Sequence, residues 1–193
     1  MQTEIEVKFL DIDIEDIRKK LEKVGAICEQ PRRLMRRQVF YPADHNKDSY
    51  IRVRDEGDKV TMTYKIFEEM SLHGAKEVEV VVSSFEDAID ILTRSGLDRK
   101  SYQETRRETW HIGTTEVVID EWPWLQPFIE IEGKTEADVR DVASKLQFDW
   151  ADAVFGSSTE AYRVQYKDLP ADFIMDDVAE IRFDLPLPDR LKP

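Results

Sequence analysis

The sequence predicts an α+β fold in which about eight antiparallel strands close into a barrel and amphipathic helices pack on its outside. Three observations support this prediction. Charged and apolar residues alternate along nearly every strand segment, three other segments have helical apolar spacing, and charges of like sign are grouped on separate strands. Helices need an apolar surface to pack on. We therefore expect the charged strand faces to point into the barrel.

The helices are predicted from capping residues and apolar spacing. Asp13 can cap a helix that ends at Gly25, and Ser84 can cap a second helix that ends at Gly96. Thr135 can begin a third helix. Each segment has one apolar face, so each helix is expected to lie on the surface of the barrel.

The strands are predicted from period-two alternation and from turn residues between the segments. The segment "EIEVKFL" shows the pattern, because Glu4, Glu6 and Lys8 alternate with apolar residues. For this strand alone, a charged face in water would explain the pattern. The predicted strands are residues 4–10, 36–42, 49–55, 59–67, 75–82, 101–111, 116–121 and 127–133.

The bulk properties exclude several classes of protein. A chain of 193 residues without a linker-like stretch predicts one domain over residues 1–193. Its net charge of -13 argues against a nucleic-acid surface, and no apolar run could cross a membrane. The start lacks a secretory signal and Cys28 is the single cysteine, so we expect a cytoplasmic protein. Monomer and homodimer both stay open.

Charges of like sign are grouped in a way that a solvated sheet face does not require. Some strands bring paired carboxylates and others bring cations: Glu4, Glu6, Glu77, Glu79, Glu130 and Glu132 on the one hand, and Arg52, Arg54 and Lys65 on the other. In a closed barrel these side chains would share one cavity. The basic run at residues 32–37 fits equally a solvated loop that leads into a strand and a part of this basic group.

Such a cavity would need ligands of both signs. Two carboxylates about 5 Å apart repel by roughly 3 kcal/mol at an effective dielectric constant near 20. Glutamate oxygens without a Cys or His cluster suit Mg²⁺ or Mn²⁺, and paired Arg and Lys side chains suit phosphate oxygens. The pattern therefore predicts a site for a metal-bound polyphosphate.

Six motifs in order resemble those of the CYTH superfamily, the triphosphate tunnel metalloenzymes. They are "EIEVK" at residues 4–8, "YIRVR" at 50–54, "TYK" at 63–65, "EVE" at 77–79, "TRRETW" at 105–110 and "VIDEWPWLQPFIEIEG" at 118–133. The resemblance extends from residue 4 to about residue 166. It implies an eight-stranded antiparallel tunnel that binds a linear triphosphate.

The resemblance also implies roles for individual residues. One or two divalent ions would be held by Glu4, Glu6, Glu130 and Glu132, with Asp120 as a further ligand or as a group that positions water. The phosphates would be bound by Lys8, Arg52, Arg54, Lys65 and either Arg106 or Arg107; the spacing to Trp110 favours Arg107. Glu77 and Glu79 match a family position for a carboxylate that binds a second metal ion or orients water. The implied catalytic residues are thus Asp120, Glu77, Glu79 and Lys8.

The chain departs from the family pattern at three places. Phe40 stands where relatives often have a tyrosine. In the expected plug helix at residues 158–166, Glu160 and Ala161 occupy the place of a lysine and its neighbour, and Arg163 is a candidate substitute for that lysine. Residues 169–193 match no motif, and packing on the barrel or on a second subunit are both open.

The function implied is metal-dependent hydrolysis of inorganic tripolyphosphate, thiamine triphosphate or a nucleoside triphosphate. The first alternative is a class IV adenylyl cyclase, which makes cyclic AMP and pyrophosphate from ATP with the same groups. Such cyclases tend to carry a His-Phe pair shortly before the first motif, and no such pair precedes Glu4, which favours hydrolysis. The second alternative is a module that binds polyphosphate or a nucleotide without turnover.

Overall fold

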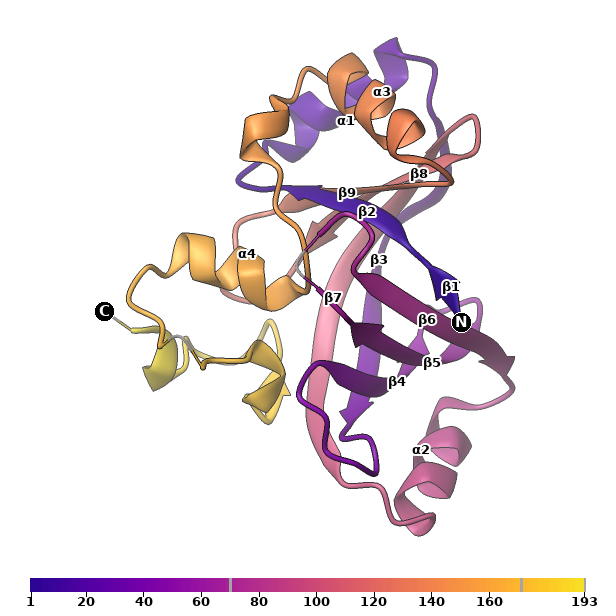
Figure 1. Cartoon of the computed structure of the whole chain (residues 1–193), viewed down its shortest axis with the longest axis vertical. Helices are drawn as coiled ribbons and strands as arrows, with labels where there is room; N and C mark the ends of the chain where they lie inside the picture. The colour runs from indigo at the N-terminus through magenta and orange to yellow at the C-terminus, as the bar shows by residue number, and fades with distance from the viewer. Residues whose placement is uncertain (70, 171, 193) are drawn as a thin grey trace.

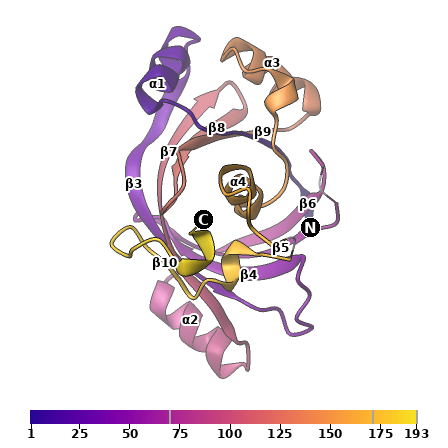
Figure 2. The same ribbon diagram turned by 90° about the vertical axis from the view of Figure 1, so that its left-hand side faces the viewer.

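The computed structural model describes residues 1–69, 71–170 and 172–192. In this part of the chain one ten-stranded sheet curls into a nearly closed barrel, as Figure 1 and Figure 2 show. The strands are β1 (Gln2–Thr3), β2 (Ile5–Phe9), β3 (Ile27–Phe40), β4 (Ser49–Asp55), β5 (Val60–Phe67), β6 (Ala75–Val82), β7 (Arg99–Ile112), β8 (Thr115–Glu121), β9 (Phe128–Gly133) and β10 (Glu180–Ile181). All neighbours pair antiparallel except β10, which lies parallel to β7.

The predicted closed barrel of eight strands needs correction. The strand order is β1-β6-β5-β4-β3-β7-β8-β9-β2, with β10 beside β7. The N-terminal segment is divided at Glu4, because its first part pairs with β6 and its second part pairs with β9. This segment reaches both edges of the sheet, but no ladder joins β2 directly to β6 in the described residues, so the seam is not sealed.

The three predicted helices are confirmed as α1 (Ile14–Lys23), α2 (Phe85–Arg94) and α3 (Glu136–Lys145). The side chains of Asp13, Ser84 and Thr135 each accept a hydrogen bond from a backbone N–H of the first turn, as capping requires. Helices α1 and α3 pack on the outer side of β2, β8 and β9, whereas α2 covers β3 and β4 (Figure 1). None of the helices in the described ranges has the length and apolar character needed to cross a membrane.

Strand β3 begins earlier than predicted. It starts at Ile27 rather than near residue 36, and it pairs with β7 along most of its length. Register shifts between Cys28 and Gln30 and between Gln30 and Arg33 accommodate the first half of the strand. The basic run at residues 32–37 therefore lies within a strand, and the solvated-loop alternative for it is wrong.

The C-terminal part packs on the barrel. It contains α4 (Ser158–Gln165), the short 3₁₀ helices η2 (Met175–Asp177) and η3 (Asp189–Leu191), and strand β10. A second apolar cluster joins this part to the barrel; its buried members are Trp122, Phe128, Tyr162, Phe173, Met175, Ile181 and Leu191. Figure 2 shows α4 and the following segments in front of one opening of the barrel. Residues 171 and 193 of the predicted tail lie outside the described residues.

Candidate active site

A cavity of about 490 Å³ lies inside the barrel. The alternation of the strands explains its lining, since the charged side chains point inward while their apolar neighbours point toward the helices. Most predicted site residues line it: Glu4, Glu6, Lys8, Arg52, Arg54, Lys65, Glu77, Glu79, Arg107, Asp120, Glu130 and Glu132. The structure thus brings together residues from β2, β4, β5, β6, β7, β8 and β9.

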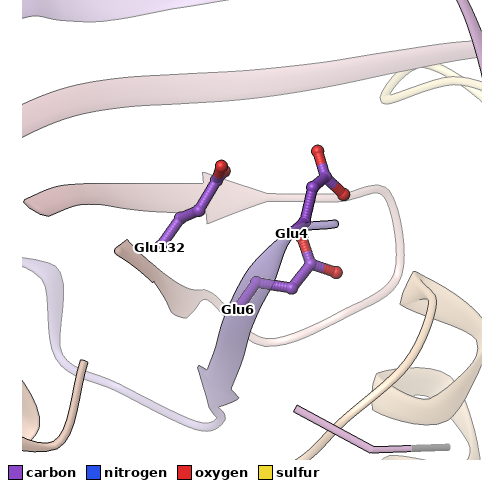
Figure 3. Close-up of side chains that lie close together, drawn as sticks. All are labelled: Glu4, Glu6 and Glu132. Atoms are coloured by element: carbon purple, nitrogen blue, oxygen red, sulfur yellow. The ribbon is translucent and has the colours of Figure 1, made fainter. Parts of the chain in front are cut away.

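Three carboxylates form a compact cluster in this cavity. Oxygen atoms of Glu4, Glu6 and Glu132 all lie within 4.8 Å of one another, and Figure 3 shows these side chains together. Glu6 on β2 is directly opposite Glu132 on β9 in the ladder. Glu4 lies just before β2, where its backbone N–H donates to the Ala75 carbonyl of β6. An all-oxygen cluster of this kind fits a hard divalent cation such as Mg²⁺ or Mn²⁺.

The cluster is electrostatically strained without a cation. Burial raises the pKa of Glu132 to about 7, and the nearby charges of Glu130 and Glu6 add to the effect. Burial also raises the pKa of Glu4 to about 8, although the Lys65 ammonium opposes this shift. Both carboxyls therefore ionise at a higher pH than ordinary glutamates do.

Two buried lysines compensate part of the negative charge. The Lys65 ammonium forms ion pairs with Glu4 and, at 3.3 Å, with Glu6. Lys8 Nζ lies 2.8 Å from Glu130 and 3.3 Å from Glu6, and it donates a hydrogen bond to the Gly156 carbonyl at 2.9 Å. Burial disfavours the Lys8 ammonium, but Glu130 and Glu6 outweigh burial and raise its pKa, so the group stays charged.

Glu130 has a different environment from the three clustered carboxylates. Burial alone would raise its pKa, but Lys8 and Arg107 outweigh burial and hold the pKa well below the usual range. Its second oxygen lies 3.9 Å from Arg107. Glu130 is thus an ionised partner of two cations, and it is not a member of the compact carboxylate cluster found among the described residues.

Arg107 faces the cavity and Arg106 does not, because neighbouring residues on β7 point to opposite faces. Arg107 holds Asp120 with two hydrogen bonds, of 2.8 and 2.5 Å, across the ladder between β7 and β8. The Arg106 guanidinium lies outside the barrel, 4.0 Å from the ring centroid of Phe183. Of the two arginines, Arg107 is therefore the one that can reach a ligand in the tunnel.

Glu77 and Glu79 line the wall formed by β6. The Thr63 hydroxyl donates a 2.7 Å hydrogen bond to Glu79, which also lies 3.6 Å from Arg52 and 3.8 Å from Arg54. Glu79 is therefore the carboxylate partner of two tunnel arginines.

Several lining residues were not predicted. Arg37, on β3, lies in the wall with 5% of its surface exposed. The basic run at residues 32–37 could have indicated its inward position, because Arg33, Met35 and Arg37 alternate there with outward-facing residues. Asp176 reaches the cavity from the C-terminal tail, and Gly156 reaches it from the segment before α4. No local pattern marks these two, because tertiary packing brings them there.

The structure also places the residues at which the chain departs from the family pattern. Phe40 is fully buried against α2, outside the tunnel. The Tyr162 hydroxyl donates to the Pro123 carbonyl at 2.7 Å, so it is engaged in packing. Arg163 Nη2 donates to the Phe173 carbonyl at 2.6 Å and is not among the lining residues, so Arg163 does not replace the lysine of relatives.

Comparison with known proteins agrees with this architecture. Residues 2–153 match the model of the CYTH domain. Among solved structures, protein PH1012 of Pyrococcus horikoshii is 25% identical, with a TM-score of 0.71 over 82% of this chain and 98% of that chain. A Vibrio parahaemolyticus protein proposed to be an adenylate cyclase is 11% identical, with a TM-score of 0.71 over 83% and 97% of the two chains.

A third structure is HpAC1 of Hippeastrum, described as revealing a dominant triphosphatase activity. It is 13% identical, with a TM-score of 0.56 over 87% of this chain and 98% of that chain. No curated protein sequence matches the chain. Because the family match covers well over half of the residues and the structures share the barrel, the chain belongs to the CYTH domain family.

Proposed function

We propose that this protein hydrolyses a linear triphosphate inside the tunnel with the help of Mg²⁺ or Mn²⁺. The observation that carries the proposal is the cluster of Glu4, Glu6 and Glu132, the first two buried and the third half-buried, next to a group of arginines and lysines in one cavity. Inorganic tripolyphosphate, thiamine triphosphate and nucleoside triphosphates all have the required chain of phosphates. The Hippeastrum protein offers a precedent for triphosphatase activity on this fold.

Glu4, Glu6 and Glu132 are the proposed metal ligands, and Glu130 and Asp120 are further candidates in the same cavity. A divalent ion held there would offset charge on the phosphoryl oxygens and lower the pKa of a coordinated water. Lys65 pairs with Glu4, and Lys8 pairs with Glu130. If these carboxylates held a cation, both ammonium groups would become available to phosphate oxygens.

The basic residues are proposed to bind and orient the triphosphate. Arg52, Arg54 and Arg107 present guanidinium groups, and Lys8 and Lys65 present point charges. These cations would stabilise the charge that develops on the phosphoryl oxygens during the reaction.

Two carboxylates on β6 have a separate proposed role. The hydrogen bond from Thr63 holds Glu79, which would orient the attacking water together with Glu77 on the same strand.

A product assay with the purified protein tests this function. Tripolyphosphate, thiamine triphosphate and ATP are offered separately with Mg²⁺ or Mn²⁺, and phosphate, pyrophosphate and cyclic AMP are resolved. We expect release of phosphate that stops when EDTA is added. Formation of cyclic AMP and pyrophosphate from ATP would make the protein a cyclase, and tight binding without any product would make it a binding module.

A further inference from the structure

Arg37 is a buried cation without a carboxylate partner. Its Nη2 donates to Thr105 Oγ1 at 2.8 Å, and its guanidinium carbon lies 4.8 Å from the ring centroid of Trp122. Its Nε has no hydrogen-bond acceptor. Among residues 1–69, 71–170 and 172–192, no carboxylate oxygen lies within 4.0 Å of this guanidinium.

The other cations of the tunnel wall differ from Arg37 in this respect. Each has a carboxylate partner: Lys8 has Glu130 at 2.8 Å, Arg54 has Glu56 at 2.7 Å, Arg107 has Asp120 at 2.5 Å, and Arg52 has Glu79 at 3.6 Å. Arg37 instead has other arginines nearby. Burial, with added repulsion from Arg52 and Arg54, lowers its pKa to about 9. A buried charge of this kind is stabilised when an anion pairs with it. The nearby Asp120 carboxylate opposes part of the pKa shift, but it forms its ion pair with Arg107 and not with Arg37.

Arg37 lies toward the end of the tunnel that the C-terminal part closes. Trp122, beneath the guanidinium, belongs to both the cavity lining and the apolar cluster that contains Tyr162 and Met175. Helix α4 and the tail cover this end (Figure 2). The register of the strands places exposed lining residues at the opposite end: Glu29, Asp58 and Lys59. The tunnel is thus a pocket with one closed end and one accessible end.

The start of α4 adds to the positive potential at the closed end. Gly156, Ser157 and Ser158 line the same cavity, and the N-terminal end of a helix dipole favours anions. The N–H groups of Thr159 and Glu160 already donate to Ser157, so the contribution of this turn is that of the dipole and of the lining residues. The ring of Trp122 packs edge-on against Tyr162 of α4, with centroids 6.5 Å apart, so Arg37 and α4 flank the same ring. Asp176 also lines the cavity, and its carboxylate accepts a 2.7 Å hydrogen bond from Gln103. This carboxylate would repel a polyphosphate longer than a triphosphate.

We propose that the closed end is a subsite for the free terminal phosphate of the substrate, held by Arg37 and the first turn of α4. This assignment rests on the proposed function, because it presumes a linear triphosphate as the ligand. The assignment fixes the direction in which the triphosphate enters the tunnel. The unsubstituted end enters first, and any organic group stays at the mouth near Glu29 and Asp58.

The first test compares Arg37→Gln with Arg36→Gln. Arg36 is the matched control, because it is adjacent, points outward and pairs with Asp55 and Glu86. Diimidotriphosphate, a non-hydrolysable analogue of tripolyphosphate, is titrated with Mg²⁺ by calorimetry. We expect R37Q to bind at least about tenfold more weakly than wild type, and R36Q to bind as wild type does. Equal affinities of folded R37Q and R36Q would overturn the subsite.

Two further measurements keep the test decisive. If R37Q does not fold, Arg37→Lys keeps the positive charge without the two-pronged guanidinium group. R37K is expected to bind diimidotriphosphate more weakly than R36Q but to respond to salt as wild type does. Unchanged affinity in R37K would contradict the proposal.

The second measurement uses wild type and esters of tripolyphosphate. Tripolyphosphate with one terminal phenyl ester should bind within about tenfold of unmodified tripolyphosphate, whereas a phenyl ester at both ends should weaken binding by at least about 100-fold. Equal binding of the two esters would overturn the closed-end assignment.

The outcomes separate this inference from the proposed function. Wild type that neither binds diimidotriphosphate nor releases phosphate from tripolyphosphate would refute both. Wild type that does both, with R37Q equal to R36Q, would refute the terminal subsite alone.

Discussion

Individual residues of the tunnel have opposite electrostatic states although they share a strand. On β9, Glu130 is held ionised by Lys8 and Arg107, whereas Glu132 has a raised pKa. The difference follows from the facing residues in the ladder. Glu130 lies opposite Lys8, and Glu132 lies opposite Glu6. Substitution of these two glutamates is therefore expected to change stability in opposite directions.

Glu132→Gln should stabilise the metal-free protein increasingly as the pH rises. The pKa of Glu132 is raised to about 7 in the folded state from 4.5, so its contribution to the free energy of unfolding is present below about pH 4.5 and is lost as the pH rises through 7. Glutamine cannot ionise and avoids this loss. Thermal midpoints in EDTA at pH 5 and pH 8 should show a larger gain for E132Q at pH 8. A gain that is constant with pH, or equal to that of the exposed control Glu22→Gln, would contradict the pKa shift.

Glu130→Gln should destabilise the protein. It removes the partner of Lys8, which is only 4% exposed, and leaves a buried ammonium with Glu6 as its remaining carboxylate neighbour. Loss of one partner of a buried pair costs about 3 kcal/mol. Urea denaturation at pH 8 in EDTA measures the difference. An E130Q variant as stable as wild type would show that the ion pair is not formed in solution.

The sequence predicts residue positions well where alternation is unbroken. Glu4, Glu6 and Lys8 point inward as period two requires, and the same rule separates Arg107 from Arg106. The inward position of Arg37 was harder to predict. The register shifts earlier in β3 interrupt the alternation, so the basic run resembled a loop as much as a strand.

At the scale of elements, the helices and hairpins followed their local signals. Asp13, Ser84 and Thr135 cap the three helices as predicted, and Gly57 and Gly113 adopt the positive φ values of the hairpin turns. The placement of α4 and the tail could not be predicted in this way. Their position depends on contacts between residues far apart in the sequence, and β10 has only two residues, too few for a recognisable alternation.

The tail is expected to contribute a measurable part of the stability. Met175, in η2, is fully buried in the apolar cluster that closes the tunnel. Met175→Ala should lower the free energy of unfolding by about 2 to 5 kcal/mol, since it leaves a cavity. Val164→Ala is the control, because Val164 on α4 is 52% exposed and should change stability by less than about 0.5 kcal/mol. Equal effects in urea denaturation would mean that the tail does not pack on the barrel in solution.

At the scale of the whole molecule, a chain with a net charge of -13 encloses a cavity with both carboxylates and cations. The two sets neutralise each other across the tunnel through pairs such as Lys65 with Glu4. A cation bound to the carboxylates would free the ammonium groups for an anion, and an anion bound to the ammonium groups would free the carboxylates. Metal and triphosphate are therefore expected to bind cooperatively.

This cooperativity can be measured by thermal unfolding. Mg²⁺ alone and diimidotriphosphate alone should each raise the melting temperature, and both together should raise it by more than the sum, because each ligand strengthens the binding of the other. Additive shifts would contradict the exchange of ion pairs inside the tunnel.

The most direct test of metal-dependent hydrolysis by the carboxylate cluster is phosphate release from tripolyphosphate at increasing Mg²⁺, with wild type and E132Q compared. Thermal unfolding of both proteins shows that each is folded. We predict release by wild type that depends on Mg²⁺ and a rate at least about 100-fold lower for E132Q. A folded E132Q that releases phosphate at the wild-type rate, or a wild-type rate that is unchanged in EDTA, would contradict the assignment of the tunnel as a metal-dependent triphosphatase site.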